Sequence, residues 1–228
     1  MAKTKLILMR HGESVWNKKN LFTGWVDVPL SDKGIEEAIE GGKKIKDIPI
    51  DIIFMSTLIR AQMTGFLAMQ QHSTTKTLVV NHEKGKLFDW GNIFNDKTKE
   101  DTIEVYFSWH LNERMYGELQ GNNKDEMRAK FGKEQVHIWR RSFDVAPKNG
   151  ESLKMTSERT LPYFKDVILP HLDKNKNVFI AAHGNSLRSI VMFLDKLSGD
   201  EVVKLEIPTG EPIIYEYENK NFIRTTKI

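Results

Sequence analysis

The chain has 228 residues and contains no cysteine. This absence excludes a disulfide framework and any metal site built on thiolates. Long hydrophobic runs are missing as well. The apolar run at residues 6–8 is too short for the core of a signal peptide, and no stretch approaches the length that spans a membrane. We therefore expect a soluble, cytoplasmic protein with no membrane partner.

A strong charge of either sign is also missing, because 34 Lys and Arg residues nearly balance 31 Asp and Glu residues, for a formal net charge of +3. A nucleic-acid-binding domain usually carries a larger basic excess, so no nucleic-acid partner is expected. A small anionic substrate is compatible with this balance. With 39% hydrophobic residues, the chain is long enough to bury one sizeable core, which predicts a single domain over residues 1–228.

Short apolar runs alternate with stretches of helical periodicity along most of the chain. Strands are predicted at residues 5–9, 50–55, 78–80 and 178–182, and a terminal hairpin at residues 213–218 and 222–226. The run at 178–182 has no polar alternation, which indicates burial on both faces. The expected fold class is therefore α/β, a three-layer α/β/α arrangement with a mostly parallel central sheet covered by helices on both sides.

Helix starts are marked by hydroxyl side chains. Ser31 is a candidate N-cap for a helix that reaches about Lys46, and Ser56 is a candidate N-cap for a helix through Gln71. Further helices are expected at residues 124–131, 134–141, 152–172 (interrupted by Pro162 and Pro170) and 186–197. Residues 84–101 are mostly polar and charged, so we predict a surface excursion with little regular structure over about residues 72–110.

Two of the predicted strands end in the same way, each with a histidine followed by a glycine. His11 and Gly12 follow the first strand, and His183 and Gly184 follow the strand at 178–182. In open α/β sheets, ligands bind outside the carboxyl ends of the strands. If the two strands are parallel neighbours, both histidines face one pocket, and the glycines let the backbone approach a ligand closely.

A histidine ring nitrogen can attack phosphorus and form a phosphohistidine. The attacking nitrogen must be unprotonated, so an acceptor should hold the other ring nitrogen. Fixed positive groups then stabilise the transferred phosphoryl group, and Arg10, Arg60 and a protonated His183 are the candidates. The alternative is a metal site made of His11, Glu13 and His183, which would leave Arg10 and Arg60 beside a cation. The other five histidines lack such companions, and we treat them as ordinary.

Several blocks of sequence carry a specific resemblance. They are RHGES at 10–14 with Trp16 and Asn17, FTGW at 22–25, LNERMYGELQG at 111–121, WRRS at 139–142, GESL at 150–153, AAHGNSLR at 181–188 and IPTG at 207–210. Together they span nearly the whole chain. On these blocks the chain resembles the cofactor-dependent phosphoglycerate mutases of the histidine phosphatase superfamily.

The resemblance implies interconversion of 3-phosphoglycerate and 2-phosphoglycerate in glycolysis and gluconeogenesis, primed by 2,3-bisphosphoglycerate and without a metal. It implies that His11 is phosphorylated, that Arg10, Arg60 and His183 surround the phosphoryl group, and that Glu113 is the general acid and base. The implied substrate-binding residues are Arg10, Ser14, Asn17, Thr23, Gly24, Arg60, Glu113, Tyr116, Lys124, Arg140, Arg141, Gly184 and Asn185. The expected partners are small phosphoglycerates and, for self-assembly, a second copy in a homodimer.

Elementary chemistry adds two expectations to these roles. A carboxylate that acts as acid and base near neutral pH needs a raised pKa, which burial or a bound phosphate would supply to Glu113. Adjacent helix residues diverge by about 100° around the axis, so at most one of Arg140 and Arg141 points into a pocket unless the helix ends there.

Two segments depart from the commoner family pattern, and other functions remain open. The stretch between Arg60 and Glu113 is longer than usual, and the stretch between Arg141 and Glu151 is shorter. A phosphatase that discharges the phosphohistidine to water is one alternative, and a bisphosphoglycerate synthase is a closer one. A non-catalytic anion-binding module would predict an incomplete set of site residues.

Overall fold

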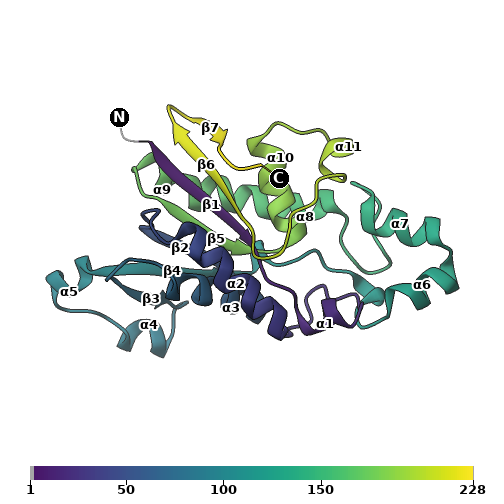
Figure 1. Cartoon of the computed structure of the whole chain (residues 1–228), viewed down its shortest axis with the longest axis horizontal. Coiled ribbons are helices and arrows are strands. Elements are labelled where there is room, and N and C mark those ends of the chain that lie inside the picture. The colour runs from purple at the N-terminus through teal and green to yellow at the C-terminus, as the bar shows by residue number, and fades with distance from the viewer. Residues whose placement is uncertain (1–2, 228) are drawn as a thin grey trace.

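The computed structural model describes residues 3–227, and over these residues seven strands form one sheet in the order β3-β4-β2-β5-β1-β6-β7. They are β1 (Thr4–Arg10), β2 (Ile52–Ser56), β3 (Thr77–Asn81), β4 (Thr102–Ser108), β5 (Val178–Ala182), β6 (Pro212–Glu218) and β7 (Asn221–Arg224). Strands β1 to β5 pair in parallel, whereas β6 and β7 are antiparallel additions at one edge. With helices on both faces (Figure 1), the predicted three-layer α/β/α fold with a mostly parallel sheet is confirmed.

Both faces of the central strands are buried, which explains why their sequences lack polar alternation. On one face, Leu6 and Leu8 of β1 belong to a core that includes residues of α9 (Leu169–Asp173) and α10 (Gly184–Leu194). On the other face, Ile7 and Met9 belong to a core shared with α2 (Asp32–Ile45) and α3 (Ile59–Gln70). Successive residues of a strand point to opposite faces, so one short run supplies two cores.

Most of the predicted helices are confirmed. Ser31 caps α2 by accepting a hydrogen bond from the Gly34 N–H. The stretch predicted at 152–172 runs as α8 (Leu153–Tyr163), a π-helical turn (Phe164–Ile168) and α9. Helices α6 (Lys124–Phe131) and α7 (Lys133–Arg141) agree with the sequence, and α10 begins two residues earlier than expected, directly after His183. Within residues 3–227, no helix is long and apolar enough to cross a membrane.

The prediction that Ser56 caps the helix through Gln71 is wrong. Strand β2 continues through Ser56, and α3 starts at Ile59 after Leu58, whose side chain makes no capping hydrogen bond. The Ser56 hydroxyl accepts from the Leu58 N–H at 3.1 Å and lies 2.6 Å from His183 Nε2. Tertiary contact with His183 therefore uses the hydroxyl that the local pattern assigned to a helix cap.

The predicted surface excursion over residues 72–110 is too wide. Strand β4 pairs on both sides, with β2 and β3, and its Ile103 and Val105 are fully buried. Only the segment between β3 and β4 leaves the sheet. It contains two short exposed helices, α4 (Lys86–Trp90) and α5 (Asp96–Glu100), at one end of the molecule (Figure 1). The alternation of Ile103 and Val105 with polar neighbours was the strand signal within this otherwise polar stretch.

Helices α2 and α3 approach each other closely at Gly42. A Cβ atom at this position would lie 2.5 Å from the backbone oxygen of Ala68, closer than packed atoms come. In an exposed helix, replacing glycine by alanine stabilises by about 1 kcal/mol. Here the added methyl group must push α2 and α3 apart, so the same substitution should destabilise the protein.

We expect Gly42→Ala to lower the free energy of unfolding by about 1–3 kcal/mol, because overpacking a closed core is destabilising. Urea unfolding followed by circular dichroism measures the change. Lys43→Ala is the matched control, since its side chain is 54% exposed on the same helix and should change stability by about 0.5 kcal/mol or less. An unchanged or increased stability of Gly42→Ala would show that the helices separate freely.

Candidate active site

His11 directly follows β1 and is 3% exposed. Its Nδ1 lies 2.6 Å from the Gly12 carbonyl oxygen. A carbonyl oxygen only accepts hydrogen bonds, so Nδ1 carries the proton and Nε2 keeps its lone pair. Burial, followed by the charges of Arg60 and Arg10, lowers the pKa of His11 well below its usual value. The ring is therefore neutral at pH 7, as the chemistry of a nucleophile requires.

His183 follows β5 as the N-cap of α10, and its ring centroid lies 4.9 Å from that of His11. The two strands pair in parallel with Arg10 opposite Ala182, which brings the following histidines together as predicted. Burial, then the charge of Arg60, also lowers the pKa of His183 well below its usual value. A proton on His183, which would make it a further donor, is therefore disfavoured, because burial and the charge of Arg60 both oppose a positive ring.

Arg10 and Arg60 come from different elements and face the same cavity. Arg60 lies in the first turn of α3, is 1% exposed, and donates to the carbonyl oxygens of Gly24 and Val26. Burial lowers the pKa of Arg60 to about 10, which still leaves it charged at neutral pH. Arg10 donates to the Ile207 carbonyl oxygen at 2.7 Å. Main-chain carbonyls thus hold both guanidinium groups in place.

Glu113 lies just after the 3₁₀ turn Trp109–Leu111 that follows β4, and it is 8% exposed. Its Oε1 accepts from the backbone N–H groups of Arg114 and Asn185, at 2.8 and 3.1 Å, and from the Asn185 side chain at 2.8 Å. Burial raises the pKa of the Glu113 carboxyl, but these hydrogen bonds and the charges of Arg10 and Arg60 outweigh burial and hold the pKa below its usual value.

Burial therefore does not supply the expected raised pKa: the pKa of Glu113 is lowered instead, and its carboxylate is ionised, in the base form. The reason is that three donors satisfy one carboxylate oxygen directly, which favours the charged form more than burial disfavours it. A phosphate dianion next to this carboxylate would act in the opposite direction.

A cavity of about 200 Å³ opens at this end of the sheet. Thirteen of the residues predicted from the sequence line it: Arg10, His11, Asn17, Thr23, Gly24, Arg60, Glu113, Tyr116, Lys124, Arg140, Arg141, Gly184 and Asn185. Two predicted residues, His183 and Ser14, do not line the cavity but pack against residues that do. His183 packs against His11, and Ser14 is the N-cap of α1 (Val15–Lys18), where its hydroxyl accepts from the Asn17 N–H and donates to the Asn17 side chain.

Helices α6 and α7 contribute three basic residues to the lining of the cavity. Lys124 is the first residue of α6, and burial followed by the charge of Arg140 lowers its pKa. Arg140 and Arg141 are the last two residues of α7, and both line the cavity. The helix ends there, which is the condition under which both were expected to reach the pocket.

The sequence did not single out Arg188 and Glu206, which also line the cavity. Arg188 lies three residues after Asn185 on α10, so helical spacing alone placed it on the same face. Glu206 lies in the irregular segment after α11 (Gly199–Val202) and accepts from Arg141 and, at 3.4 Å, from Arg188. No local signal marks Glu206, because two residues distant in sequence define its role.

His11, Glu113 and His183 each offer one ligand atom, and these three atoms lie within 4.8 Å of one another. Glu113 thus takes the place that the sequence alternative gave to Glu13, whose carboxylate instead accepts from Ser31. The same cluster can hold a proton-transfer group next to a nucleophile. The positive charges of Arg10 and Arg60 at the same cavity favour an anion over a metal cation.

Comparison with known proteins agrees with this geometry. The model of the histidine phosphatase superfamily (branch 1) matches residues 6–85 and 89–226. Among solved structures, Bacillus stearothermophilus YhfR aligns with a TM-score of 0.76 over 98% of this chain and 96% of its own, at 23% identity. A mycobacterial glucosyl-3-phosphoglycerate phosphatase aligns with a TM-score of 0.73 over 98% of both chains, at 18% identity. At such identities, the likeness shows a shared fold.

Sequence relatives are much nearer. The chain is 62% identical to the 2,3-bisphosphoglycerate-dependent phosphoglycerate mutase of Protochlamydia amoebophila, over 98% of this chain and 99% of that protein. It is 56% identical to the protein of the same name from Chlamydia trachomatis, over 97% of both chains. It is 57% identical to phosphoglycerate mutase 1 of Arabidopsis thaliana, over 96% of this chain and 66% of that protein. The chain therefore belongs to the histidine phosphatase superfamily and, within it, to the family of 2,3-bisphosphoglycerate-dependent phosphoglycerate mutases.

Proposed function

We propose that the chain interconverts 3-phosphoglycerate and 2-phosphoglycerate, in glycolysis and gluconeogenesis, through a phosphohistidine at His11. The observation that carries this proposal is the geometry of one cavity. A neutral histidine with a free Nε2 lies beside the buried Arg60 and the half-buried Arg10, and within 4.8 Å of an ionised carboxylate. A nucleophile, fixed positive charge and a base are the groups that reversible phosphoryl transfer needs. The names of two relatives at 56–62% identity support the same reaction.

The cavity fits a ligand with several negative charges. Six basic side chains line it, from Arg10, Arg60, Lys124, Arg140, Arg141 and Arg188, against the two carboxylates of Glu113 and Glu206. Arginine forks match phosphate and carboxylate oxygens in two-point contacts. Phosphoglycerates and 2,3-bisphosphoglycerate carry such groups at both ends. When bound, 2,3-bisphosphoglycerate supplies the phosphoryl group that primes His11.

The residues of the chain then have the following roles. When a substrate hydroxyl attacks the phosphorus on His11, a new P–O bond forms, the P–N bond breaks, and Glu113 accepts the hydroxyl proton. When His11 Nε2 takes a phosphoryl group back, the P–O bond breaks and Glu113 returns the proton to the leaving oxygen. Arg10 and Arg60 stabilise the charge on the phosphoryl oxygens throughout. His183, which packs against His11, adds to this stabilisation.

The remaining lining residues bind the phosphate and carboxylate groups that do not react. We assign this role to Asn17, Thr23, Gly24, Tyr116, Lys124, Arg140, Arg141, Gly184 and Asn185. Ser14 acts on the ligand only through Asn17, which its hydroxyl orients. A metal-free mechanism, a homodimer and a cytoplasmic location stay predictions.

The central test is an enolase-coupled assay with 3-phosphoglycerate, with and without 2,3-bisphosphoglycerate. We expect strong stimulation by the bisphosphate, and His11→Ala should lower kcat by roughly a thousandfold or more, because the phosphoryl acceptor is gone. Release of inorganic phosphate is measured in parallel. Rates of phosphate release comparable with mutase turnover would instead identify a phosphatase, and unchanged activity of folded His11→Ala would exclude His11 as the nucleophile.

The pH dependence of His11 follows from its buried, positively charged surroundings. Because its pKa is lowered well below 6.5, the ring should stay neutral as pH falls from 7.5 through 6.5, and protonation should appear only below that range. Nitrogen NMR of the imidazole rings should show a proton on Nδ1 and a bare Nε2 across this window. A His11 ring that titrates at or above pH 6.5 would contradict the assigned environment.

Chelation tests the metal-free mechanism. Because Arg10 and Arg60 supply the positive charge at the phosphoryl site, incubation with EDTA should leave kcat within about twofold of its starting value. A two-step assay measures this: the EDTA-treated mutase first turns over without added metal and is stopped, and the 2-phosphoglycerate is then measured with enolase and magnesium. If activity were lost and a divalent ion restored it, the cluster of His11, Glu113 and His183 would have to be assigned as a metal site.

A further inference from the structure

The segment that carries Glu113 has little regular structure of its own. It runs from Trp109 to Met115 after β4, and its only regular element is the 3₁₀ turn Trp109–Leu111. A segment of this kind does not hold a side chain at a defined angle unless other elements fix it. Several groups bond to this segment, and one side chain of α8 reaches more of its carbonyl oxygens than any other.

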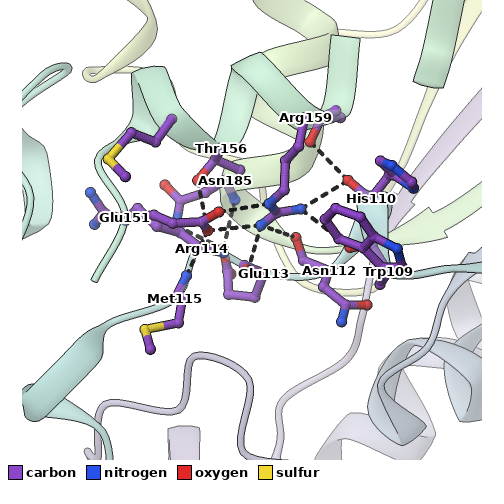
Figure 2. A network of polar contacts seen from close by, with 12 residues as sticks. Trp109, His110, Asn112, Glu113, Arg114, Met115, Glu151, Thr156, Arg159 and Asn185 are labelled. Atoms are coloured by element: carbon purple, nitrogen blue, oxygen red, sulfur yellow. Dashed lines mark hydrogen bonds and ion pairs between the residues drawn. The ribbon is translucent and has the colours of Figure 1, made fainter. Parts of the chain in front are cut away.

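Arg159 of α8 donates to the carbonyl oxygens of four residues of this segment (Figure 2). Its Nη1 lies 3.3 Å from the Trp109 carbonyl oxygen and 2.9 Å from that of His110. Its Nη2 lies 3.1 Å from the Asn112 carbonyl oxygen and 2.9 Å from that of Glu113. One planar guanidinium therefore sets the direction of the main chain up to and including Glu113.

Glu151 holds Arg159 from the other side (Figure 2). The Arg159 Nε and Nη2 atoms donate to the two Glu151 carboxylate oxygens at 2.8 and 2.9 Å, in a two-point ion pair whose side chains are 10% and 18% exposed. The same carboxylate accepts from the Met115 N–H at 2.9 Å. The ion pair therefore bonds to the main chain both before Glu113, at Asn112, and after it, at Met115.

Neither Arg159 nor Glu151 lines the cavity. The main chain of Glu113 faces Arg159, while its carboxylate faces the cavity and Asn185. Trp25 Nε1 donates to the same Glu113 carbonyl oxygen, and the Arg159 guanidinium lies over the Trp25 ring at 5.4 Å. A small rotation of this main chain would move the carboxylate, and misplacement by about 1 Å can cost a hundredfold in rate.

We propose that Arg159, held by Glu151, is the positioning residue that sets the Glu113 carboxylate for proton transfer. The inference rests on the proposed function, in which Glu113 exchanges a proton with the substrate. Lysine cannot replace the guanidinium, because three donors on one nitrogen do not reach four carbonyls and two carboxylate oxygens in one plane.

The test is a double-mutant cycle of Arg159→Lys with Glu113→Gln in the enolase-coupled assay. Arg159→Lys should lower kcat roughly thirtyfold to a hundredfold and leave the KM for 3-phosphoglycerate within about threefold. In the Glu113→Gln background, the same substitution should change kcat by less than about threefold, because the group that it positions is already gone. Glu151→Gln should show the same non-additivity with a smaller loss.

Arg224→Lys is the matched control, because Arg224 also forms an ion pair with a carboxylate, that of Asp195 at 3.2 Å, but on β7 and away from the cavity. It should leave kcat unchanged. Thermal unfolding of every variant shows that the assays compare folded proteins, and Glu151→Gln provides the cycle if Arg159→Lys is not folded.

A loss of the same factor in both backgrounds would overturn the proposal, since Arg159 would then act on the fold as a whole. Wild-type kcat in Glu113→Gln would overturn the proton-transfer role of Glu113 itself, and would separate a failure of the proposed function from a failure of the positioning role.

Discussion

The parallel pairing of β1 with β5 is the constraint on which the site depends. The register places Arg10 opposite Ala182, and the His11 N–H donates to the Ala182 carbonyl oxygen at 3.0 Å. Each strand then ends in a histidine, so the pairing places the two rings 4.9 Å apart. A shift of one residue would turn one ring toward the opposite face of the sheet. The apolar side chains on both faces hold this register because either core would lose its contacts.

The second requirement is positive charge that main-chain carbonyl groups hold at the cavity. Arg60 and Arg10 remain in the pocket because main-chain carbonyl oxygens of Gly24, Val26 and Ile207 accept their hydrogen bonds. These dipoles neutralise the arginine charge only in part. Burial is the largest cause of the lowered pKa of His11 and His183, and the arginine charge lowers both values further. The same arginines that the proposed function assigns to the phosphoryl group therefore keep His11, the proposed nucleophile, in its neutral form.

Much of the chemistry could be predicted from local sequence. Arg10, His11 and His183 stand at strand ends, where parallel sheets present side chains to ligands, and helix signals placed Arg60, Lys124, Arg140 and Arg141 correctly at their elements. The resemblance to the mutases supplied Glu113. The buried strand β4 was missed because a single alternating stretch lies inside a long polar segment. The hydroxyl of Ser56 was misassigned because its contact with His183 is 127 positions away.

The sequence by itself determined the class of fold, the ends of most elements and the place of His11 and His183 at strand ends, because these depend on periodicity, capping and the residue that follows each strand. Only the tertiary structure decided the protonation of Glu113 and His183, the place of Ser14 behind Asn17, and the contacts of Glu206 and Arg159. Each of these is set by groups that come together from distant segments. Their pKa values and orientations depend on distance and burial, which local sequence does not encode.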